Sequence, residues 1–332
     1  MPARVRFWHG GCFRPALLLF ESRRARALDA RALLLCPGTK GLETAARRGS
    51  SPGWSGPAHG IAGFVCGGTG MRRVLIYFRE ILVSLPLALI KGWKCFGWRG
   101  SWLAFQDLVF TRLFFPVRVP GFGMLRRRNE ARSLMDNFCL GELRCEEVEQ
   151  VLRSHPAPVV VDLGINLGMS VRWWFHLNPK ARVTGFEMMQ EALDYTGARL
   201  RDSHPEADWT PVCCAVSAAD AEAMEVCFDD ALEGTTSAVR SAGTQKRSVP
   251  ARCLDSVVRE DDVVLLKCDI EGFGGHALEG ARAVLKRTRY VVTETHGPEE
   301  MERMSRVLFE EGFAPFKLAA RSLWWRSLEF KL

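Results

Sequence analysis

Apolar and polar positions alternate in blocks along the second half of the chain. Runs rich in β-branched and other apolar residues predict strands, and helical patterns separate several of them. The predicted strands are Pro158–Leu163, Arg182–Phe186, Thr210–Ala215, Val263–Cys268 and Tyr290–Thr293. The helical patterns are Met169–Leu177, Glu191–Arg201, His276–Lys286 and Pro298–Glu311. This alternation predicts an α/β domain over residues 156–332, with a mostly parallel sheet covered by helices on both faces.

The last two predicted strands depart from this alternation. Phe313–Leu318 and Ser322–Phe330 are joined only by Ala319–Arg321. So short a link cannot contain a crossover, so the two strands must form an antiparallel hairpin. A parallel sheet that ends in one reversed hairpin is typical of the Rossmann-like methyltransferase fold and not of a dinucleotide-binding dehydrogenase.

Residues 71–155 show mainly helical patterns before this domain, including Arg144–His155. The stretch Val74–Ile90 is strongly apolar, but its longest uncharged run has ten residues, about half of the ~20 that a membrane crossing requires. Basic residues and tryptophans flank this run, so residues 72–102 also suit a helix that lies in a membrane surface and makes a peripheral contact. We favour a helical cap on the catalytic domain, with the surface helix as the alternative and a true span as the least favoured interpretation.

Charge and composition set the N-terminus apart. The 332-residue chain has a formal charge of +7, but residues 1–70 carry ten basic and three acidic side chains, whereas residues 71–332 carry 35 of each. Because the folded part has no excess of positive charge, we expect no nucleic-acid partner. Residues 1–70 lack a helical or strand period and end in a stretch rich in Gly, Ser and Pro, so we predict a disordered or non-native extension. We favour the interpretation that the natural protein starts at Met71. The alternative is that residues 1–70 are a basic tail or targeting peptide.

The eleven cysteines show no paired zinc-binding spacing, and a chain of this length does not depend on disulfides. We therefore expect a reduced, cytoplasmic setting, with membrane association as the alternative that residues 72–102 raise.

A glycine turn, D-L-G-I-N-L-G, follows the first predicted strand. Such turns hold nucleotides because a ligand can approach bare backbone there. Asn166 occupies a position where the dinucleotide fingerprint requires glycine. Asp162 would repel a pyrophosphate, but it would attract the ammonium and sulfonium groups of S-adenosylmethionine. Together with Gly164 and Gly168, these residues predict an S-adenosylmethionine site, with a simple tight turn as the alternative.

An acidic residue, Glu187, follows the second predicted strand. A carboxylate at this strand end can accept hydrogen bonds from both ribose hydroxyls of an adenosine. NAD sites share the feature, so it supports an adenosine without identifying the cofactor. A surface glutamate is the alternative.

Charged residues also follow the fourth and fifth predicted strands. Lys267, Asp269 and Glu271 alternate, so period-two geometry directs them to one side as the strand leaves the sheet. Asp269 there could orient an acceptor hydroxyl or take its proton. Glu294 and His296 follow the fifth strand, and an imidazole suits a base at neutral pH. We assign Asp269, His296 and Lys267 to catalysis and Glu271 and Glu294 to the acceptor, with a structural ion pair of Lys267 as the alternative.

These motifs, in this order, resemble the FkbM family of methyltransferases across residues ~156–320, as estimated from the strand and helix pattern. The family pattern D-x-G-A-N-x-G is matched by Asp162, Gly164, Asn166 and Gly168, and its strand-end glutamate by Glu187. Its L-D segment is matched by Leu254-Asp255, its K-x-D-x-E-G block by residues 267–272, and its E-x-H by Glu294 and His296. The resemblance implies O-methylation of a hydroxyl on a sugar, glycan or secondary metabolite, with S-adenosylmethionine as the only cofactor and no metal.

Two positions depart from the family pattern. Ile165 replaces a frequent alanine, and Gly274 stands where the block usually carries a second glutamate. The change at Gly274 motivates an alternative function, a catalytically inactive domain that binds S-adenosylmethionine as a binding module. A dehydrogenase is disfavoured by Asp162 and Asn166, and a base methyltransferase by the absence of an N-P-P-aromatic motif.

Overall fold

A computed structural model describes residues 69–110, 113–232 and 245–330. Of the predicted extension at residues 1–70, all but the last two residues lie outside this part. Contacts divide the chain into two units, residues 1–84 and residues 85–332. The first contributes the beginning of helix α2 (Thr69–Val109), and the second contains everything discussed below. The domain boundaries predicted at residues 70 and 155 stay predictions.

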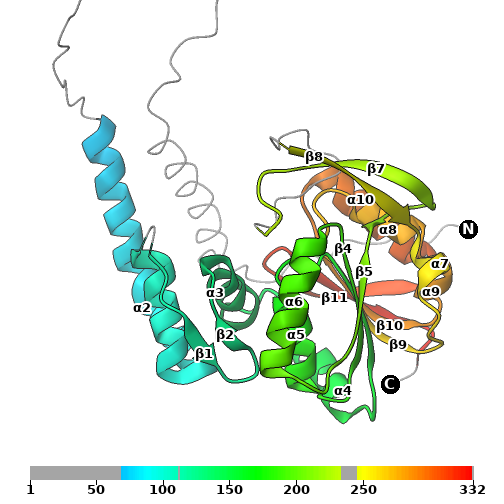
Figure 1. The fold of residues 1–332 in the computed structure, drawn as a ribbon, viewed down its shortest axis with the longest axis horizontal. Helices are drawn as coiled ribbons and strands as arrows, with labels where there is room; N and C mark the ends of the chain where they lie inside the picture. The colour runs from blue at the N-terminus through cyan, green and yellow to red at the C-terminus, as the bar shows by residue number, and fades with distance from the viewer. Residues whose placement is uncertain (1–68, 111–112, 233–244, 331–332) are drawn as a thin grey trace, which may run out of the picture. The chain divides into compact units, whose positions relative to one another are not determined.

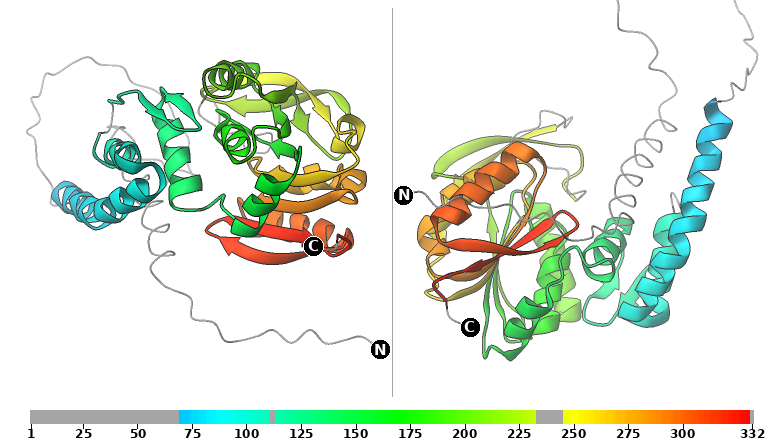
Figure 2. Two further views of the ribbon diagram at one scale, coloured as in Figure 1. Left: turned by 90° about the horizontal axis from the view of Figure 1, so that it is seen from below. Right: turned by 180° about the vertical axis from the view of Figure 1, so that it is seen from behind.

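A seven-stranded sheet forms the centre of residues 85–332 (Figure 1), in the order β11-β12-β10-β9-β3-β4-β5. Its strands are β3 (Val159–Leu163), β4 (Arg182–Glu187), β5 (Asp208–Cys213), β9 (Val263–Cys268), β10 (Thr288–Glu294), β11 (Phe313–Ala319) and β12 (Ser322–Ser327). Neighbours from β10 to β5 are parallel, whereas β12 is antiparallel to both β10 and β11. Figure 2 shows this terminal hairpin in red at the sheet edge. The predicted Rossmann-like methyltransferase fold is confirmed.

Helices cover both faces of the sheet because its central strands are apolar on both sides. Val160 and Leu265 pack toward one cluster, and Val161 and Leu266 toward the other. The first cluster contains side chains of α4 (Glu146–Ser154), α5 (Met169–Leu177) and α6 (Gln190–Ser203). The second contains side chains of α7 (Leu254–Val257), α8 (Gly274–Glu279), α9 (Arg282–Leu285) and α10 (Pro298–Glu310). Because β3 and β9 are covered on both faces, their sequences are almost continuously apolar.

Two features of residues 156–332 differ from the sequence prediction. The helix predicted over His276–Lys286 is divided into α8 and α9 at Gly280, where a Cβ would overlap the Ser217 carbonyl oxygen. The structure also contains a three-stranded sheet, β6-β8-β7, which the sequence analysis missed. Its strands are β6 (Ala215–Val216), β7 (Ala221–Phe228) and β8 (Gln245–Arg252). Most positions of β7 and β8 are partly or fully exposed, and apolar residues alternate only over short stretches near the end of each strand.

Residues 85–155 combine helices with a small hairpin. Helix α2 bends at Phe96 and Gly97, whose φ of +60° lies in the left-handed region. The two arms meet where Gly92 contacts Gly100, and a Cβ on either glycine would overlap the other backbone. The rest of the segment contains β1 (Val117–Val119), β2 (Gly123–Leu125), α3 (Arg128–Leu134), the π-helix η1 (Met135–Cys139) and α4. The mainly helical prediction for this segment omitted the hairpin.

A buried ion pair joins α3 to α5. Arg172 Nη2 donates to Glu130 Oε1 at 2.7 Å, and both side chains are fully buried. The second carboxylate oxygen accepts hydrogen bonds from the Tyr195 hydroxyl and from the backbone N–H groups of Arg126 and Arg127. Because this pair fixes α3, it also fixes the polar side chains that α3 directs into the cavity described next.

Candidate active site

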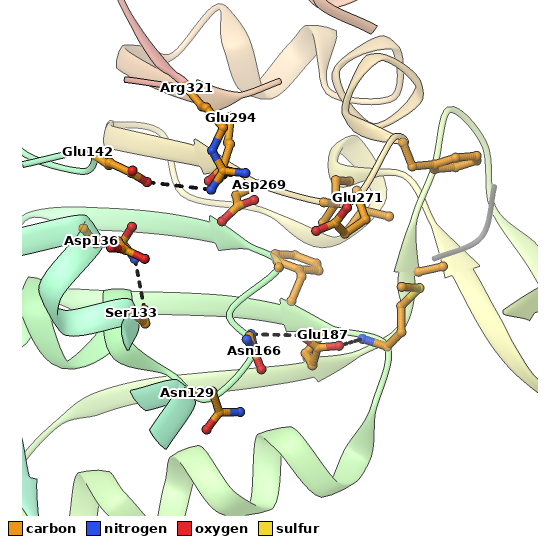
Figure 3. A pocket seen from close by; sticks show the side chains of 18 of the residues that line it. Asn129, Ser133, Asp136, Glu142, Asn166, Glu187, Asp269, Glu271, Glu294 and Arg321 are labelled. Carbon is orange, nitrogen blue, oxygen red and sulfur yellow. Dashed lines mark hydrogen bonds and ion pairs between the residues drawn. The ribbon is translucent and has the colours of Figure 1, made fainter. Parts of the chain in front are cut away.

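A cavity of about 320 Å³ lies at the carboxyl ends of the parallel strands (Figure 3). Its volume falls in the usual range of small-molecule sites, and its position is where open α/β sheets bind ligands. The wall includes residues from the loops after β3, β4, β9 and β10, from α3 and η1, and from the β11–β12 turn. The polar residues of this wall are Asn129, Arg132, Ser133, Asp136, Asn137, Glu142, Asn166, Glu187, Asp269, Glu271, Glu294 and Arg321.

The glycine turn after β3 brings bare backbone into this wall. Gly164 has a φ of +74°, and a Cβ there would overlap the carbonyl oxygen of Asp269. Asn166 also has a positive φ, and its N–H donates to Glu187 Oε2 at 3.0 Å. Gly164 and Asn166 line the cavity as the sequence analysis expected, whereas Gly168 begins α5 against Thr196 and is not in the wall.

Glu187 lies in the wall at the end of β4. Its Oε1 accepts hydrogen bonds from the N–H groups of Met188 and Met189, at 2.8 and 3.2 Å. Burial raises the pKa of Glu187, while these donors and the N–H of Asn166 oppose the shift. The backbone therefore fixes the orientation of the carboxylate beside the glycine turn, as a ribose-binding role requires.

Asp162 and Lys267 lie beneath the cavity, which corrects the position expected for both. Asp162 is fully buried, and its carboxylate contacts Trp174 Nε1 at 2.8 Å and Lys267 Nζ at 3.1 Å. Lys267 also donates to the carbonyls of Leu163 and Gly164 and lies 3.4 Å from Asp269 Oδ2. Neither residue is in the wall of the main cavity. The arrangement is the buried ion pair named above as the alternative, and it orients the glycine turn and Asp269.

Asp269, Glu294 and His296 form one cluster at the ends of β9 and β10. Nε2 of His296 lies 3.5 Å from Asp269 Oδ1, and Nδ1 lies 3.5 Å from Glu271 Oε2. Burial disfavours the Asp269 carboxylate, but Lys267 and His296 outweigh it and lower the pKa of Asp269 to about 2. Asp269 is therefore ionised at neutral pH. Its carboxylate is better suited to orienting an acceptor hydroxyl than to acting as a strong base.

The pKa values of Glu294 and His296 shift upward. Burial and the neighbouring Asp269 raise the pKa of Glu294 to about 8. Burial alone would lower the pKa of His296, but Asp269 and Glu271 outweigh it and raise it to about 8. His296 is not in the cavity wall, so the geometry does not give it the direct contact with an acceptor that its predicted role as a base needs.

Several wall residues were not predicted from the sequence. Arg321, in the β11–β12 turn, lies 2.9 Å from Glu294 Oε1 and 3.7 Å from Glu142 Oε2 (Figure 3). The register explains its place, because Ser322 pairs with Glu294 across β12 and β10. The predicted hairpin contained this signal, since a strand antiparallel to β10 must begin at the carboxyl end of β10.

The opposite side of the wall comes from α3 and η1. Asn129, Ser133 and Asp136 are on the cavity side of these helices (Figure 3), and Asn137 donates to the Ser133 hydroxyl at 3.0 Å. Single π-turns are rare and frequent at functional sites. No sequence motif marked these residues, because amide and hydroxyl side chains on a helix are usually only solvated.

Gly274 lies outside the cavity wall, at the start of α8. Its N–H donates to Glu300 Oε1 at 2.9 Å, and the other Glu300 oxygen accepts from the N–H of His296 at 2.9 Å. A Cβ at position 274 would lie only 3.1 Å from the Glu300 carboxylate. Glu300, which the sequence analysis did not single out, thus connects the loops that follow β9 and β10.

The strand order, the reversed terminal hairpin and a ligand-sized cavity at the carboxyl edge are those of the Rossmann-like methyltransferase fold. Residues 164–315 match the model of the methyltransferase FkbM domain. This match agrees with the family resemblance of the motifs, and a methyltransferase domain of this kind implies S-adenosylmethionine as the methyl donor.

Among the solved structures that match part of this chain are three methyltransferases of distant sequence. Precorrin-6y C5,15-methyltransferase from Geobacter metallireducens is 17% identical over 56% of this chain and 89% of its own, with a TM-score of 0.31. An S-adenosylmethionine-dependent O-methyltransferase from Thermotoga maritima is 11% identical over 63% and 75%, with a TM-score of 0.37. The ribosomal protein L11 methylase of Lactobacillus delbrueckii subsp. bulgaricus is 11% identical over 55% and 77%, with a TM-score of 0.33. The comparison with curated proteins found no match.

Proposed function

We propose that this domain transfers a methyl group from S-adenosylmethionine to a hydroxyl of a sugar, glycan or secondary metabolite. One observation carries the proposal: a single cavity holds Glu187 beside the glycine turn and Asp269 with Glu294 at the next two strand ends. The first group suits an adenosine, and the second suits an acceptor hydroxyl placed close to it.

The residues of this cavity fit the methyl donor. The wall offers bare backbone at Gly164 and a carboxylate at Glu187 that three N–H groups hold in place. When bound, S-adenosylmethionine supplies an electrophilic methyl group whose bond to sulfur breaks, with the electron pair staying on sulfur, as the acceptor oxygen bonds to carbon. Glu187 would hold the ribose hydroxyls, and the backbone near Gly164 would contact the rest of the donor.

Asp269 would orient the acceptor. Lys267 contacts its Oδ2, and the Gly164 turn contacts its backbone, so the carboxylate has little freedom to rotate. An ionised carboxylate so fixed can accept the hydrogen bond of an acceptor hydroxyl and receive its proton as the new bond forms. Asn129, Ser133 and Asp136 would complete the acceptor side with amide, hydroxyl and carboxylate groups. Such groups recognise a polyhydroxylated molecule.

A methyl-transfer screen tests this proposal. Purified protein is incubated with donor labelled in the methyl group and with lipid-linked glycans or small hydroxylated metabolites, and the products are analysed for base-stable methyl ethers. Asp269→Asn should lower turnover by roughly 10²–10⁴-fold while donor affinity and melting temperature stay near those of the wild type. The control is Asp208→Asn, which changes an exposed aspartate at the start of β5.

Each contrary result has a distinct meaning. Near-normal turnover of Asp269→Asn would remove the proposed role of Asp269. Unfolding of that variant, with Asp208→Asn unaffected, would assign Asp269 a structural role only. Donor binding without product in every acceptor class would favour the alternative function, a binding module that retains the fold.

We also propose that helix α2 makes a peripheral contact with an anionic membrane surface. Four large apolar side chains of this helix are about half exposed, namely Leu87 (46%), Ile90 (54%), Trp93 (62%) and Trp98 (57%). Lys91 and Lys94 are exposed between them. Exposed tryptophans next to lysines suit the headgroup region of anionic lipids. No helix in the described residues is long and apolar enough to cross a bilayer.

Vesicle sedimentation tests this contact. The protein should bind vesicles that contain phosphatidylserine more than vesicles of phosphatidylcholine alone. Lys91→Glu with Lys94→Glu should abolish that preference, and Trp93→Ser should weaken binding to both vesicles. Leu318→Ser, which removes an equally exposed apolar side chain (62%) from β11, serves as the control. Equal binding by all of these variants would refute the assignment to α2.

A further inference from the structure

The cluster at the ends of β9 and β10 has the donors of a metal site. One carboxylate oxygen of Asp269, one of Glu294 and one ring nitrogen of His296 all lie within 4.8 Å of one another. An ion with bonds of about 2.1 Å holds neighbouring donors about 3.0–3.4 Å apart. His296 Nε2 and Asp269 Oδ1, at 3.5 Å, are already near this spacing, and Glu294 would need to move closer by about 1–2 Å. The main chain of the two strand ends can stay in place.

The imidazole of His296 supplies independent evidence for a ligand. Its side chain is only 8% exposed, and Nε2 is buried without a hydrogen-bond partner. Its other nitrogen, Nδ1, lies 3.5 Å from Glu271 Oε2. Metal-binding histidines regularly have a carboxylate at the second ring nitrogen, which keeps the proton there and presents the lone pair of the first nitrogen to the ion. A buried Nε2 that makes no hydrogen bond and lies 3.5 Å from the Asp269 carboxylate fits this arrangement.

The local charges leave room for a divalent cation. Lys267 contacts both Asp162 and Asp269, and Arg321 contacts both Glu142 and Glu294. Four carboxylates thus share two cationic side chains. In addition, Lys267 faces Oδ2 of Asp269 and Arg321 faces Oε1 of Glu294, so the second oxygen of each carboxylate is the one open to an ion.

We infer that Asp269, Glu294 and His296 bind one divalent first-row metal ion, with Glu271 orienting the imidazole. Two carboxylates and one imidazole combine the ligand preferences of manganese with those of iron or zinc. Binding of the ion itself does not depend on the proposed function. The effect of the ion on catalysis does depend on the proposed function. Because Asp269 and Glu294 line the cavity, an ion bound to them would meet the acceptor hydroxyl of the proposed reaction and polarise it.

Binding of Mn²⁺ to the purified full chain, treated first with a chelator, tests the site directly. The signal of free Mn²⁺ in electron paramagnetic resonance should fall with a stoichiometry of one ion per chain. His296→Ala, Asp269→Asn and Glu294→Gln should each abolish this binding, and Glu271→Gln should weaken it by about 10–100-fold. His276→Ala is the matched control, because His276 also has a carboxylate neighbour but its Nε2 contacts Arg303, and it should bind as the wild type does.

Melting temperatures distinguish a variant that has lost its metal ligand from one that is misfolded. Mn²⁺ should raise the melting temperature of the wild type and of His276→Ala, but not that of Glu294→Gln, which keeps the size of the side chain. The site is refuted if the wild type binds Mn²⁺ no better than His296→Ala does. If Mn²⁺ binds as expected but no acceptor is methylated, the metal site stands and the proposed function fails. If methyl transfer proceeds at full rate in chelator and no Mn²⁺ binds, the function stands and the metal site fails.

Discussion

Removing the arginine of the buried pair between α3 and α5 should destabilise the protein severely. In Arg172→Met, a long apolar side chain replaces the guanidinium, so the Glu130 carboxylate stays fully buried without its cation. Breaking a buried pair from one side costs about 3–5 kcal/mol. Arg172 also donates to the carbonyl oxygens of Phe122 and Leu167, and unsatisfied buried carbonyls add to the loss. We therefore expect the upper part of that range.

Urea denaturation at neutral pH measures this effect, with Arg118→Met as the control. Arg118 pairs with Asp202 at 2.9 Å, but its side chain is 58% exposed, so its loss should cost less than about 1 kcal/mol. The variant Glu130→Gln and the double variant Arg172→Met/Glu130→Gln complete a thermodynamic cycle. Because the double variant leaves no unpaired buried charge, it should be more stable than the sum of the single effects predicts, by about 1–3 kcal/mol.

Two results would refute this reasoning. One is a loss for Arg172→Met no larger than that for Arg118→Met, which would mean that water or a neighbouring group compensates Glu130. The other is strict additivity in the cycle, which would mean that the two side chains stabilise the fold independently and that the pair does not fix α3.

Three further predictions concern the donor, acid stability and the N-terminus. Glu187→Ala should weaken donor binding by about 1.5–3 kcal/mol, as measured by calorimetry; Glu187→Gln separates lost charge from a disturbed turn, and unchanged affinity in both would exclude the ribose role. Arg247 lowers the pKa of Glu191 to about 2, so their pair should stabilise the fold above pH ~4.3 and lose this contribution as the pH falls toward 2. Because the two side chains are 46% and 36% exposed, the difference between wild type and Glu191→Gln in urea should not exceed about 1 kcal/mol at pH 7 and should vanish near pH 2. A chain that begins at Met71 should melt and bind donor as the full chain does, and a lower melting temperature would place part of the fold before residue 71.

The sequence predicted the main sheet because its central strands are buried on both faces. Val263–Cys268 was predicted with the same bounds as β9, and Met169–Leu177 with those of α5. The hairpin β11–β12 followed from the short link alone. The strands β7 and β8 were missed because their many exposed positions carry charged residues and alanine, and the apolar alternation in each is short. Patterning thus predicts elements that fill a core and misses those that cover a surface.

Predicting the site required more than the positions of strand ends. Glu187 and Asp269 were found because an acid after a parallel strand can only lie near the carboxyl edge. The same rule placed Asp162 and Lys267 in the cavity, but position along a strand does not tell which side chain turns toward a neighbouring strand. Asp162 pairs with Lys267 across β3 and β9, and the two charges neutralise each other below the site. The register of a parallel pair decides this, and the sequence does not specify it.

Gly274 illustrates how a departure from a family pattern can mislead when only the sequence is considered. Its lack of a carboxylate was the reason to consider an inactive domain as the alternative function. The structure places Gly274 outside the cavity wall and puts the Glu300 carboxylate within 3.1 Å of where a side chain at 274 would begin. Because Glu300 also accepts the N–H of His296, it holds the loop that carries this imidazole against the start of α8. A carboxylate is thus present in this region, supplied by α10 instead of by the motif, and Gly274 provides the space that it occupies. The substitution therefore gives no structural reason to expect loss of activity.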